Sequence, residues 1–426
     1  MAILEKLKKK NILKSIGPGF ITGSADDDPS GIATYSQTGA MYGLSLLWSA
    51  LFMLPMLYVV QEMSARISFV TGKGISKVIK TYYNPMYVYI IVSILTVANI
   101  INIGVDLGAM ANSVRLFIPI NFYILIIFFT VLIISLEVFI AYKKYVNILK
   151  FLCFFLLAYV FTGFIIQPNW LNVLKATVVP SLQFSKSYLY IVVGLLGTTI
   201  SPYMVFWQSS EEIEEEKKDK LITYRRGIPS VGKKLIKGIK LETFTGMLYS
   251  EIMTWFIIIT SALTLNVHGI TNITSSSQAA SELLPLVHSF PNAGLLTELI
   301  FALGIIGTGL VAIPTLAGSI SYAVSDAFNI KEGLEYKFKS AKRFYLIITI
   351  ATVIGMAINF IHINSYQALI FSAFLNGVLN IPILIFITVI GNRKSILGGF
   401  TNSVFTNIVS VITILLVSLA FIFSVY

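Results

Sequence analysis

Three consecutive carboxylates, Asp26, Asp27 and Asp28, interrupt an otherwise apolar N-terminal stretch. A charge at the centre of a bilayer costs at least ~2.5–3.5 kcal/mol, so three together cannot face lipid. They must line a cavity or bind cations. Behind them, Pro29 removes a backbone donor and Gly31 loosens the helix. The run predicts a helix broken at its acids, which is typical of a cation site.

A second interruption rich in Gly, Thr, Ser and Pro follows five predicted spans later, at residues 197–203. Paired interrupted helices at corresponding positions of two halves indicate a transporter site at the membrane midplane. The unwound turns free backbone carbonyls, and the half-helix ends contribute dipoles. The alternative is a pair of ordinary proline kinks. The spacing of the two breaks, and the three aspartates in one of them, favour the site.

The elements that must position these residues are membrane helices. Of the 426 residues, 56% are hydrophobic and only 12% are charged, and the mean hydropathy is +0.82. Soluble domains carry about 25% charged residues. Repeated long apolar stretches predict an all-α polytopic membrane protein with one transmembrane domain over residues 1–426. Eleven spans are expected, at residues 15–40, 43–70, 84–112, 121–141, 146–166, 187–210, 241–265, 297–325, 343–361, 364–391 and 402–425.

The distribution of positive charge predicts the orientation. With the N-terminus in the cytoplasm, the cytoplasmic segments and span ends hold 28 of the 31 Lys and Arg residues, and only Arg115, Lys175 and Lys186 fall outside. This asymmetry is what the positive-inside rule requires. The net charge of +11 therefore reflects cytoplasmic loops rather than a nucleic-acid partner. We expect a multi-pass protein of the plasma membrane that has no removable signal peptide and functions as a monomer. The single cysteine, Cys153, provides neither a disulfide framework nor a thiolate metal site.

At the two breaks the chain resembles the Nramp superfamily of divalent-metal transporters, which have a LeuT-like fold. The family carries Asp-Pro-Gly-Asn at the first break, and this chain has Asp28-Pro29-Ser30-Gly31; the family's Met-Pro-His at the second is Ser201-Pro202-Tyr203 here. Further matches are Gln61-Glu62-Met63 with Ala65-Arg66, Thr71-Gly72-Lys73-Gly74, Asp106-Leu107-Gly108 and Thr315-Leu316-Ala317-Gly318. The resemblance implies broken helices 1 and 6 and two inverted five-helix repeats, at about 15–166 and 187–391, plus an extra helix at 402–425. The departures are similar to the Nramp-related magnesium transporter branch.

Those departures set the expected ion chemistry. Carried over by position, the family's metal ligands become Asp28, Gly31, the Thr198 carbonyl and Ser201, so the family's sulfur and amide are absent. A thioether favours softer transition metals, whereas sites made only of oxygen suit Mg²⁺, Ca²⁺ and Mn²⁺. Mg²⁺ sheds water reluctantly and binds through one or two carboxylates with retained waters. The resemblance and the ligand types together predict a roomy site for partly hydrated Mg²⁺ that also accepts Mn²⁺. No cofactor is expected, because the metal is the substrate.

The coupling residues also depart from the family. Proton-coupled Nramps have a histidine where this chain has Tyr203, and an acid pair in span three of which only Asp106 survives, because Ala109 stands at the other position. The three histidines, His268, His288 and His362, lie in or near predicted outer loops. We therefore expect transport that is not strictly proton-coupled and is driven by the ion gradient and the membrane potential. Asp106 or Glu251 could still carry a proton.

Several other polar residues are candidates for the site or its pathway. Of Asp26 and Asp27, one is expected to point to the cavity mouth and the other to cap the following half-helix. Glu251 lies inside span seven, where an acid is a functional candidate by default. Asn376 and Asn380, one turn apart in span ten, either face the ion or form hydrogen bonds between helices.

Three alternatives remain open. The first is a proton-coupled transporter of Mn²⁺ or Fe²⁺. The second is a cation-coupled symporter of amino acids or other organic solutes, against which three aspartates at the break argue. The third is a non-transporting membrane sensor or scaffold, against which the lack of an attached output domain in this sequence argues. An enzyme is not expected, because no nucleophile–base constellation or phosphate-binding loop is present. Glu62 and Arg66, at i and i+4, are expected to form a structural or gating ion pair.

Overall fold

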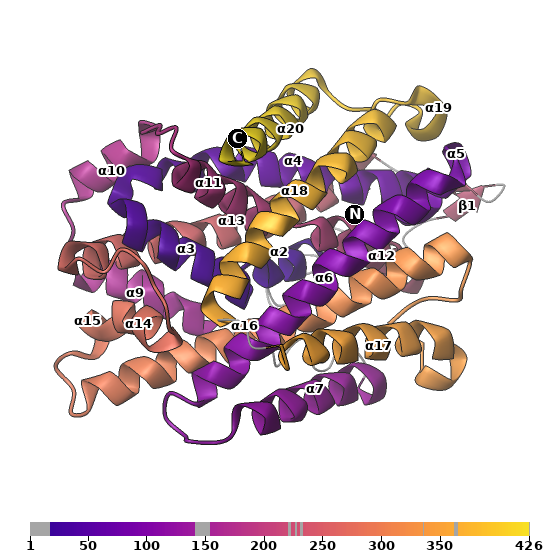
Figure 1. Ribbon diagram of the computed structural model, residues 1–426. Helices are drawn as coiled ribbons and strands as arrows, with labels where there is room; N and C mark the ends of the chain where they lie inside the picture. The colour runs from indigo at the N-terminus through magenta and orange to yellow at the C-terminus, as the bar shows by residue number, and fades with distance from the viewer. Residues whose placement is uncertain are drawn as a thin grey trace.

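The computed structural model describes residues 18–140, 154–219, 223–225, 228–230, 233–334, 336–361 and 365–425. The secondary structure of these residues is helical except for one small antiparallel hairpin, β1 (Thr223–Arg225) and β2 (Ile228–Ser230), in which Thr223 pairs with Ser230. The predicted all-α class is therefore confirmed, with a hairpin of two three-residue strands added between the second break and the next long helix (Figure 1).

The helices follow the predicted order. In the first part of the chain they are α2 (Pro18–Asp26), α3 (Pro29–Tyr42), η2 (Gly43–Leu46), α4 (Trp48–Thr71), α5 (Ile75–Tyr82), α6 (Pro85–Val114), α7 (Phe122–Phe139), η3 (Phe154–Leu156), α9 (Leu157–Ile165) and α10 (Trp170–Val178). The second part contains α11 (Lys186–Thr199), α12 (Pro202–Asp219), α13 (Lys233–Thr264), η4 (Asn266–His268), α14 (Ser276–Ala280), η5 (Ser281–Leu283), α15 (Leu284–Val287), α16 (Ala293–Phe328), η6 (Phe338–Ser340), α17 (Lys342–Ile358), α18 (Ser365–Gly391), α19 (Lys394–Leu397) and α20 (Val404–Val425).

Seven helices in the described ranges are long and apolar enough to cross a membrane. They are α6, α7, the α11–α12 segment Lys186–Glu214, α13, α16, α18 and α20. Two bent pairs, Pro29–Leu46 with Trp48–Thr71 at 108° and Phe154–Ile165 with Trp170–Val178 at 119°, bring the number to nine if each is one span. The chain is therefore a multi-pass membrane protein.

The other predicted spans correspond to helices that are not, taken one at a time, both long and apolar enough to be counted as membrane-crossing. The predicted span 15–40 is divided between α2 and α3, the span 43–70 is α4, and the span 343–361 is the 17-residue α17. Residues 146–153 of the predicted span 146–166 lie outside the described residues, and η3 and α9 cover most of the remainder. The total of eleven spans, and the repeat boundaries at 15–166 and 187–391, stay predictions.

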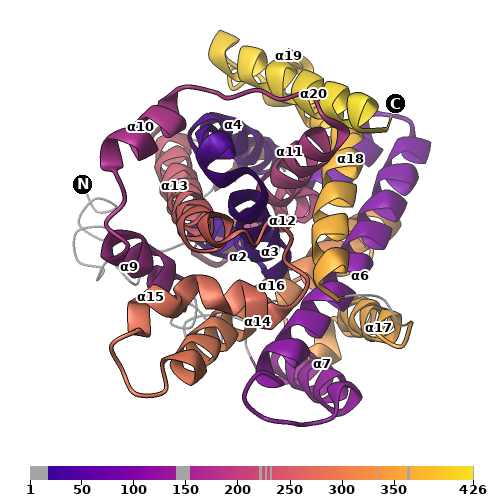
Figure 2. The same ribbon diagram turned by 60° about the vertical axis from the view of Figure 1, so that its left-hand side comes forward.

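The broken helices lie inside the molecule. Figure 2 shows α2, α3, α11 and α12 surrounded by α4, α6, α13, α16 and α18, with α7, α17 and α20 on the outside. Burial agrees: 89% of the most apolar window in Lys186–Glu214 is buried, against 22% of that in α20. The candidate site is therefore enclosed by protein, and α7 and α20 present apolar surface to lipid.

Glycines allow the broken helices to touch their neighbours through the backbone. A Cβ added at Gly23 of α2 would lie 2.2 Å from the carbonyl oxygen of Gly246 on α13. Similarly, a Cβ at Gly197 of α11 would lie 2.1 Å from the carbonyl oxygen of Ala373 on α18. Both distances are far inside van der Waals contact, so any larger residue would separate the helices. These contacts fix the two breaks against α13 and α18.

Candidate functional site

The two breaks face each other. A Cβ added at Gly31, in the first turn of α3, would lie 3.0 Å from Thr198 Oγ1, at the end of α11, and 3.4 Å from Asp28 Oδ1. The turn from Asp28 to Gly31 and the Thr198 hydroxyl therefore lie side by side. Because a methyl group at position 31 would crowd that hydroxyl, the absence of a side chain there lets the two breaks approach each other.

Asp28 is the N-cap of α3. Its Oδ1 accepts hydrogen bonds from the Ser30 hydroxyl at 2.7 Å and the Gly31 backbone N–H at 2.6 Å. Its Oδ2 accepts from Asn102 Nδ2 on α6 at 2.8 Å, and the residue is only 2% exposed. The helix N-terminus stabilises negative charge at this position. The prediction that Asp26 or Asp27 caps the half-helix is therefore wrong: Asp28 has the extended backbone (φ −68°, ψ 170°) that a cap requires.

At the second break, two predicted ligands are joined to each other. The Ser201 hydroxyl donates to the Thr198 carbonyl at 2.6 Å and lies 3.0 Å from the Gly197 carbonyl. Because its proton is directed at these carbonyls, the lone pairs of Ser201 Oγ remain available. The Thr198 and Thr199 hydroxyls are buried without a hydrogen-bond partner in the described part of the chain. The second break therefore carries several hydroxyl and carbonyl oxygens, of which the Thr198 hydroxyl lies beside Gly31 of the first break.

Asp26 and Asp27 turn away from Asp28 toward α13. Ser250 Oγ donates to Asp26 Oδ2 at 2.5 Å and lies 3.3 Å from Asp27 Oδ1. Glu251, the next residue on α13, interacts electrostatically with both aspartates. Asp26 Oδ1, Asp27 Oδ2 and both Glu251 oxygens are buried and make no hydrogen bond to a described residue. Ser250 was not predicted from the sequence; its contact spans more than 220 positions, so no local pattern reveals it.

Asp106 and Asn102 bring α6 to the site. Asp106 interacts electrostatically with Asp28 and with the backbone N–H of Ser30, in the first turn of α3. Asn102, one turn earlier, was also missed by the sequence analysis. Its spacing of four residues from Asp106 on an apolar helix is the signal that could have found it.

The remaining candidates lie beside the breaks. The Tyr203 hydroxyl donates to the Ala25 carbonyl at 2.8 Å, which ties the start of α12 to the end of α2. On α18, Asn380 Nδ2 donates to the Ile200 carbonyl at the second break, the interhelical role left open above. Asn376 is 1% exposed, and its Oδ1 has no partner among the described residues.

Histidine and acid clusters do not contribute in the described ranges. His268 is in η4 and His288 follows α15, whereas His362 lies outside the described residues. No three His, Cys, Asp or Glu side chains of the described part converge as a metal-ligand set. The predicted set, with one carboxylate and otherwise carbonyl, hydroxyl and water oxygens, does not require such a cluster.

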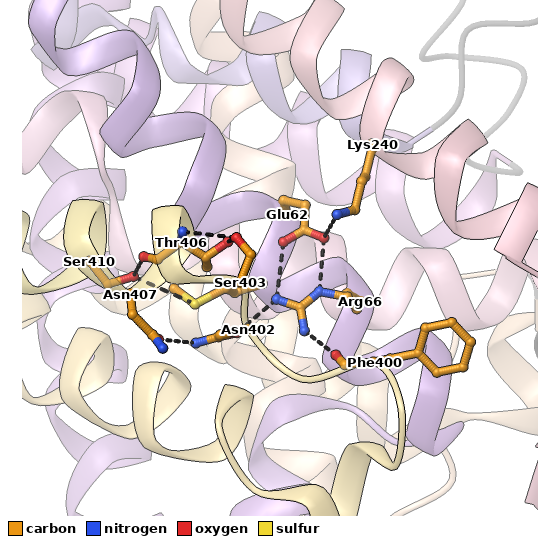
Figure 3. Close-up of polar contacts among 10 residues, drawn as sticks. Glu62, Arg66, Lys240, Phe400, Asn402, Ser403, Thr406, Asn407 and Ser410 are labelled. Atoms are coloured by element: carbon orange, nitrogen blue, oxygen red, sulfur yellow. Dashed lines mark hydrogen bonds and ion pairs between the residues drawn. The ribbon is translucent and has the colours of Figure 1, made fainter.

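The predicted Glu62–Arg66 ion pair is confirmed and belongs to a larger network (Figure 3). Arg66 Nε lies 2.8 Å from Glu62 Oε1, and Lys240 Nζ of α13 lies 3.2 Å from the same oxygen. Arg66 also donates to the Phe400 carbonyl at 2.5 Å and to Asn402 Oδ1 at 2.8 Å. The network ties α4 to α13 and to the connection before α20.

Two curated proteins are similar to this chain in sequence. The divalent metal cation transporter MntH of Erwinia tasmaniensis is 27% identical over 311 residues, covering 72% of this chain and 71% of that protein. The MntH of Clostridium acetobutylicum is 25% identical over 426 residues, covering 95% of this chain and 88% of that protein.

Two solved structures are similar in fold. A manganese transporter of Eremococcus coleocola, in complex with an aromatic bis-isothiourea compound, has a TM-score of 0.74 at 16% identity, with 96% of this chain and 85% of that chain covered. Mhp1, a nucleobase-cation-symport-1 family transporter in a closed conformation, has a TM-score of 0.62 at 11% identity, with 96% and 92% covered. The predicted LeuT-like fold is confirmed by these likenesses.

The family resemblance first seen at the two breaks extends along almost the whole chain. A family profile described as natural resistance-associated macrophage protein-like matches residues 19–426. With the fold and the paired breaks, this match establishes that the chain belongs to the Nramp family.

Proposed function

We propose that this protein transports divalent metal cations across the membrane by alternating access, with Mg²⁺ and Mn²⁺ as its main substrates. The observation that carries the proposal is the buried Asp28 carboxylate at the N-terminus of α3, in the turn that the Thr198 hydroxyl of the second break approaches. The curated relatives named divalent metal cation transporters support the substrate class.

The ligand chemistry supports hard ions. Asp28 supplies the charge, and the Thr198 carbonyl and Ser201 hydroxyl supply neutral oxygens. Gly31 brings no side chain to the site, so water would complete the coordination of a partly hydrated ion. Mg²⁺ binds through few carboxylates and keeps several waters, and oxygen ligands also suit Mn²⁺. No sulfur atom belongs to this proposed set, which disfavours Cd²⁺ and other soft ions.

The proposed driving force is the ion gradient together with the membrane potential. A divalent ion gains about 4.6 kcal/mol per 100 mV, twice the value for a single charge. The position of a family histidine is taken by Tyr203, whose hydroxyl donates to a backbone carbonyl. We place the protein in the plasma membrane with its N-terminus in the cytoplasm, as the charge distribution requires. The ion then passes from Asp28 past Asp27 and Glu251 toward the cytoplasm.

The test is Mg²⁺ and Mn²⁺ uptake into proteoliposomes containing wild-type protein, Asp28→Asn or the control Glu137→Gln. Both residues are buried acids with 2% exposure, but Glu137 lies on the peripheral helix α7. We expect Asp28→Asn to abolish uptake and the control to retain it. Equal uptake by wild type and Asp28→Asn would refute the site. Uptake of Cd²⁺ at far lower concentration than Mg²⁺ would refute the hard-ion preference.

One observation favours a second candidate, proton-coupled transport of Mn²⁺ or Fe²⁺. Asp106 is completely buried and interacts electrostatically with Asp28. Such a carboxyl could exchange a proton when the metal binds. A pH dye inside the same proteoliposomes separates the candidates: acidification that tracks metal uptake, and that Asp106→Asn abolishes, establishes coupling. Metal uptake without acidification supports the uncoupled mechanism.

A further inference from the structure

The orientation of the Asn102 amide is fixed by its partner. Asn102 Nδ2 lies 2.8 Å from Asp28 Oδ2, and both residues are buried. An ionised carboxylate can only accept hydrogen bonds, so the NH₂ group of the amide must face it. The other end of the amide, Oδ1, must then point away from Asp28 Oδ2. The assignment of nitrogen and oxygen in this side chain therefore follows from chemistry.

The oxygen of this amide accepts no hydrogen bond from the residues that the structure describes. Asn102 is 0% exposed, and its Oδ1 makes no hydrogen bond to any residue that the structure describes. Asp106, one turn further along α6, interacts electrostatically with Asp28 and with the backbone N–H of Ser30. Buried acceptors are normally satisfied by a donor, a water or a cation, because leaving them bare costs free energy. The Asn102 oxygen is such a buried acceptor, and no described residue donates to it.

We propose that Asn102 is a metal-binding and specificity-determining residue: its amide nitrogen holds the Asp28 carboxylate, and its Oδ1 contacts the transported cation or a water bound to it. The inference rests on the proposed function, because it places a further ligand at the Asp28 site. Gly31 lies beside Asp28 Oδ1 and brings no side chain, whereas Asn102 of α6 binds Oδ2 and would supply a neutral oxygen to the site.

The proposal has a consequence for selectivity. An amide oxygen is a hard ligand and favours Mg²⁺ and Mn²⁺ over Cd²⁺, whereas a thiol favours Cd²⁺. Removing the amide should weaken the binding of Mg²⁺ more than the binding of Cd²⁺. Replacing the amide with a thiol should strengthen the binding of Cd²⁺. A purely structural role for Asn102 would change the amount of active protein and leave the ratio between the two ions unaltered.

The experiment measures the KM for Mg²⁺, Mn²⁺ and Cd²⁺ in proteoliposomes for wild type, Asn102→Ala and Asn102→Cys. The control is Asn99→Ala, since Asn99 is an equally buried amide one turn away whose Nδ2 donates to Ser319 Oγ at 2.7 Å and not to Asp28. Gel filtration verifies that each variant is folded. We expect Asn102→Ala to raise the KM for Mg²⁺ and Mn²⁺ about tenfold and that for Cd²⁺ less than threefold. Asn102→Cys should lower the KM for Cd²⁺.

Two results would overturn the inference. One is an equal change for all three ions in Asn102→Ala, matched by Asn99→Ala. The other is a KM for Cd²⁺ that Asn102→Cys leaves unaltered or raises; this second variant decides the question if the alanine variant does not fold. Failure of the proposed function looks different. If wild-type protein carries Mn²⁺ but no Mg²⁺, the magnesium proposal fails, while the comparison of Mn²⁺ with Cd²⁺ still tests Asn102.

Discussion

Glu282 should make the stability of this protein depend on pH. It lies in η5, within the connection between α13 and α16, and is completely buried. Its Oε1 accepts hydrogen bonds from the Ser36 hydroxyl of α3 at 2.7 Å and from the Tyr159 hydroxyl of α9 at 3.0 Å. Burial, the largest effect, raises the pKa of this carboxyl from 4.5 to about 8, and the hydroxyls of Ser36, Tyr159 and Ser261 oppose that shift only in part. Between about pH 4.5 and pH 8, the Glu282 carboxyl therefore keeps a proton in the folded protein that it releases in the unfolded chain.

The sign and size follow from the two pKa values. Because the pKa is raised in the folded state, the contribution to stability is complete below pH 4.5 and is lost progressively until about pH 8. Above that pH it does not change further. The shift covers about 3.5 pH units. At about 1.36 kcal/mol per unit, the stability lost over this range is about 5 kcal/mol.

The assay is the unfolding of purified protein in detergent, followed between pH 5 and pH 9 for wild type, Glu282→Gln and Glu298→Gln. The glutamine cannot ionise, so the difference in stability between wild type and Glu282→Gln should fall with pH up to about 8 and then level off. Glu298, on α16, accepts from the Ser277 hydroxyl at 3.2 Å near the surface and should keep the wild-type profile. A Glu282→Gln profile parallel to wild type across the whole range would refute the reasoning.

Two substitutions test the contacts around the breaks and at the ion-pair network. Gly31→Ala would place a Cβ 3.0 Å from Thr198 Oγ1, whereas the added Cβ of Gly194→Ala, on α11, would lie 3.6 Å from its nearest neighbour, the Thr34 methyl group. Overpacking costs ~1–3 kcal/mol. We therefore expect the KM for Mg²⁺ to rise about tenfold in Gly31→Ala and to change little in Gly194→Ala. Similar KM values in the two variants would contradict the geometry. Arg66→Ala leaves Glu62 as a buried acid without its arginine, and breaking such a pair costs ~3–5 kcal/mol of stability. Denaturant titration should give a loss of unfolding free energy near the lower end of this range, because the half-exposed Lys240 still lies 3.2 Å from Glu62. Unaltered stability would mean that the network contributes nothing.

The positions of the two breaks could be predicted because their signals are local. A proline lacks a backbone donor wherever it lies, and Pro29 and Pro202 each begin a half-helix as the sequence indicated. The apolar stretches likewise predicted the long helices, since a bilayer requires that length and composition. The predicted ion pair of Glu62 and Arg66 also depended only on helical spacing.

Which acid points where could not be predicted in the same way. The three aspartates have identical side chains, and their directions depend on the backbone turn at Asp28 and on Ser250, more than 220 residues away. The β1–β2 hairpin is short and its strands have no alternating pattern, so the sequence offered no strand signal there. Asn102 was missed because an asparagine in a membrane helix usually serves packing between helices.

The way in which Asp28 is held bears on how the site can open. Its Oδ1 is bound by Ser30 and Gly31, which move with α3, whereas its Oδ2 is bound by Asn102, which moves with α6. Any rotation of α3 relative to α6 therefore preserves the first pair of hydrogen bonds and stretches the second. A cation held by Asp28 and, directly or through a bound water, by the Asn102 oxygen would strengthen this link between α3 and α6. The proposed ion would thus bind where the two helices must separate, so that binding favours the closed arrangement and release accompanies its opening.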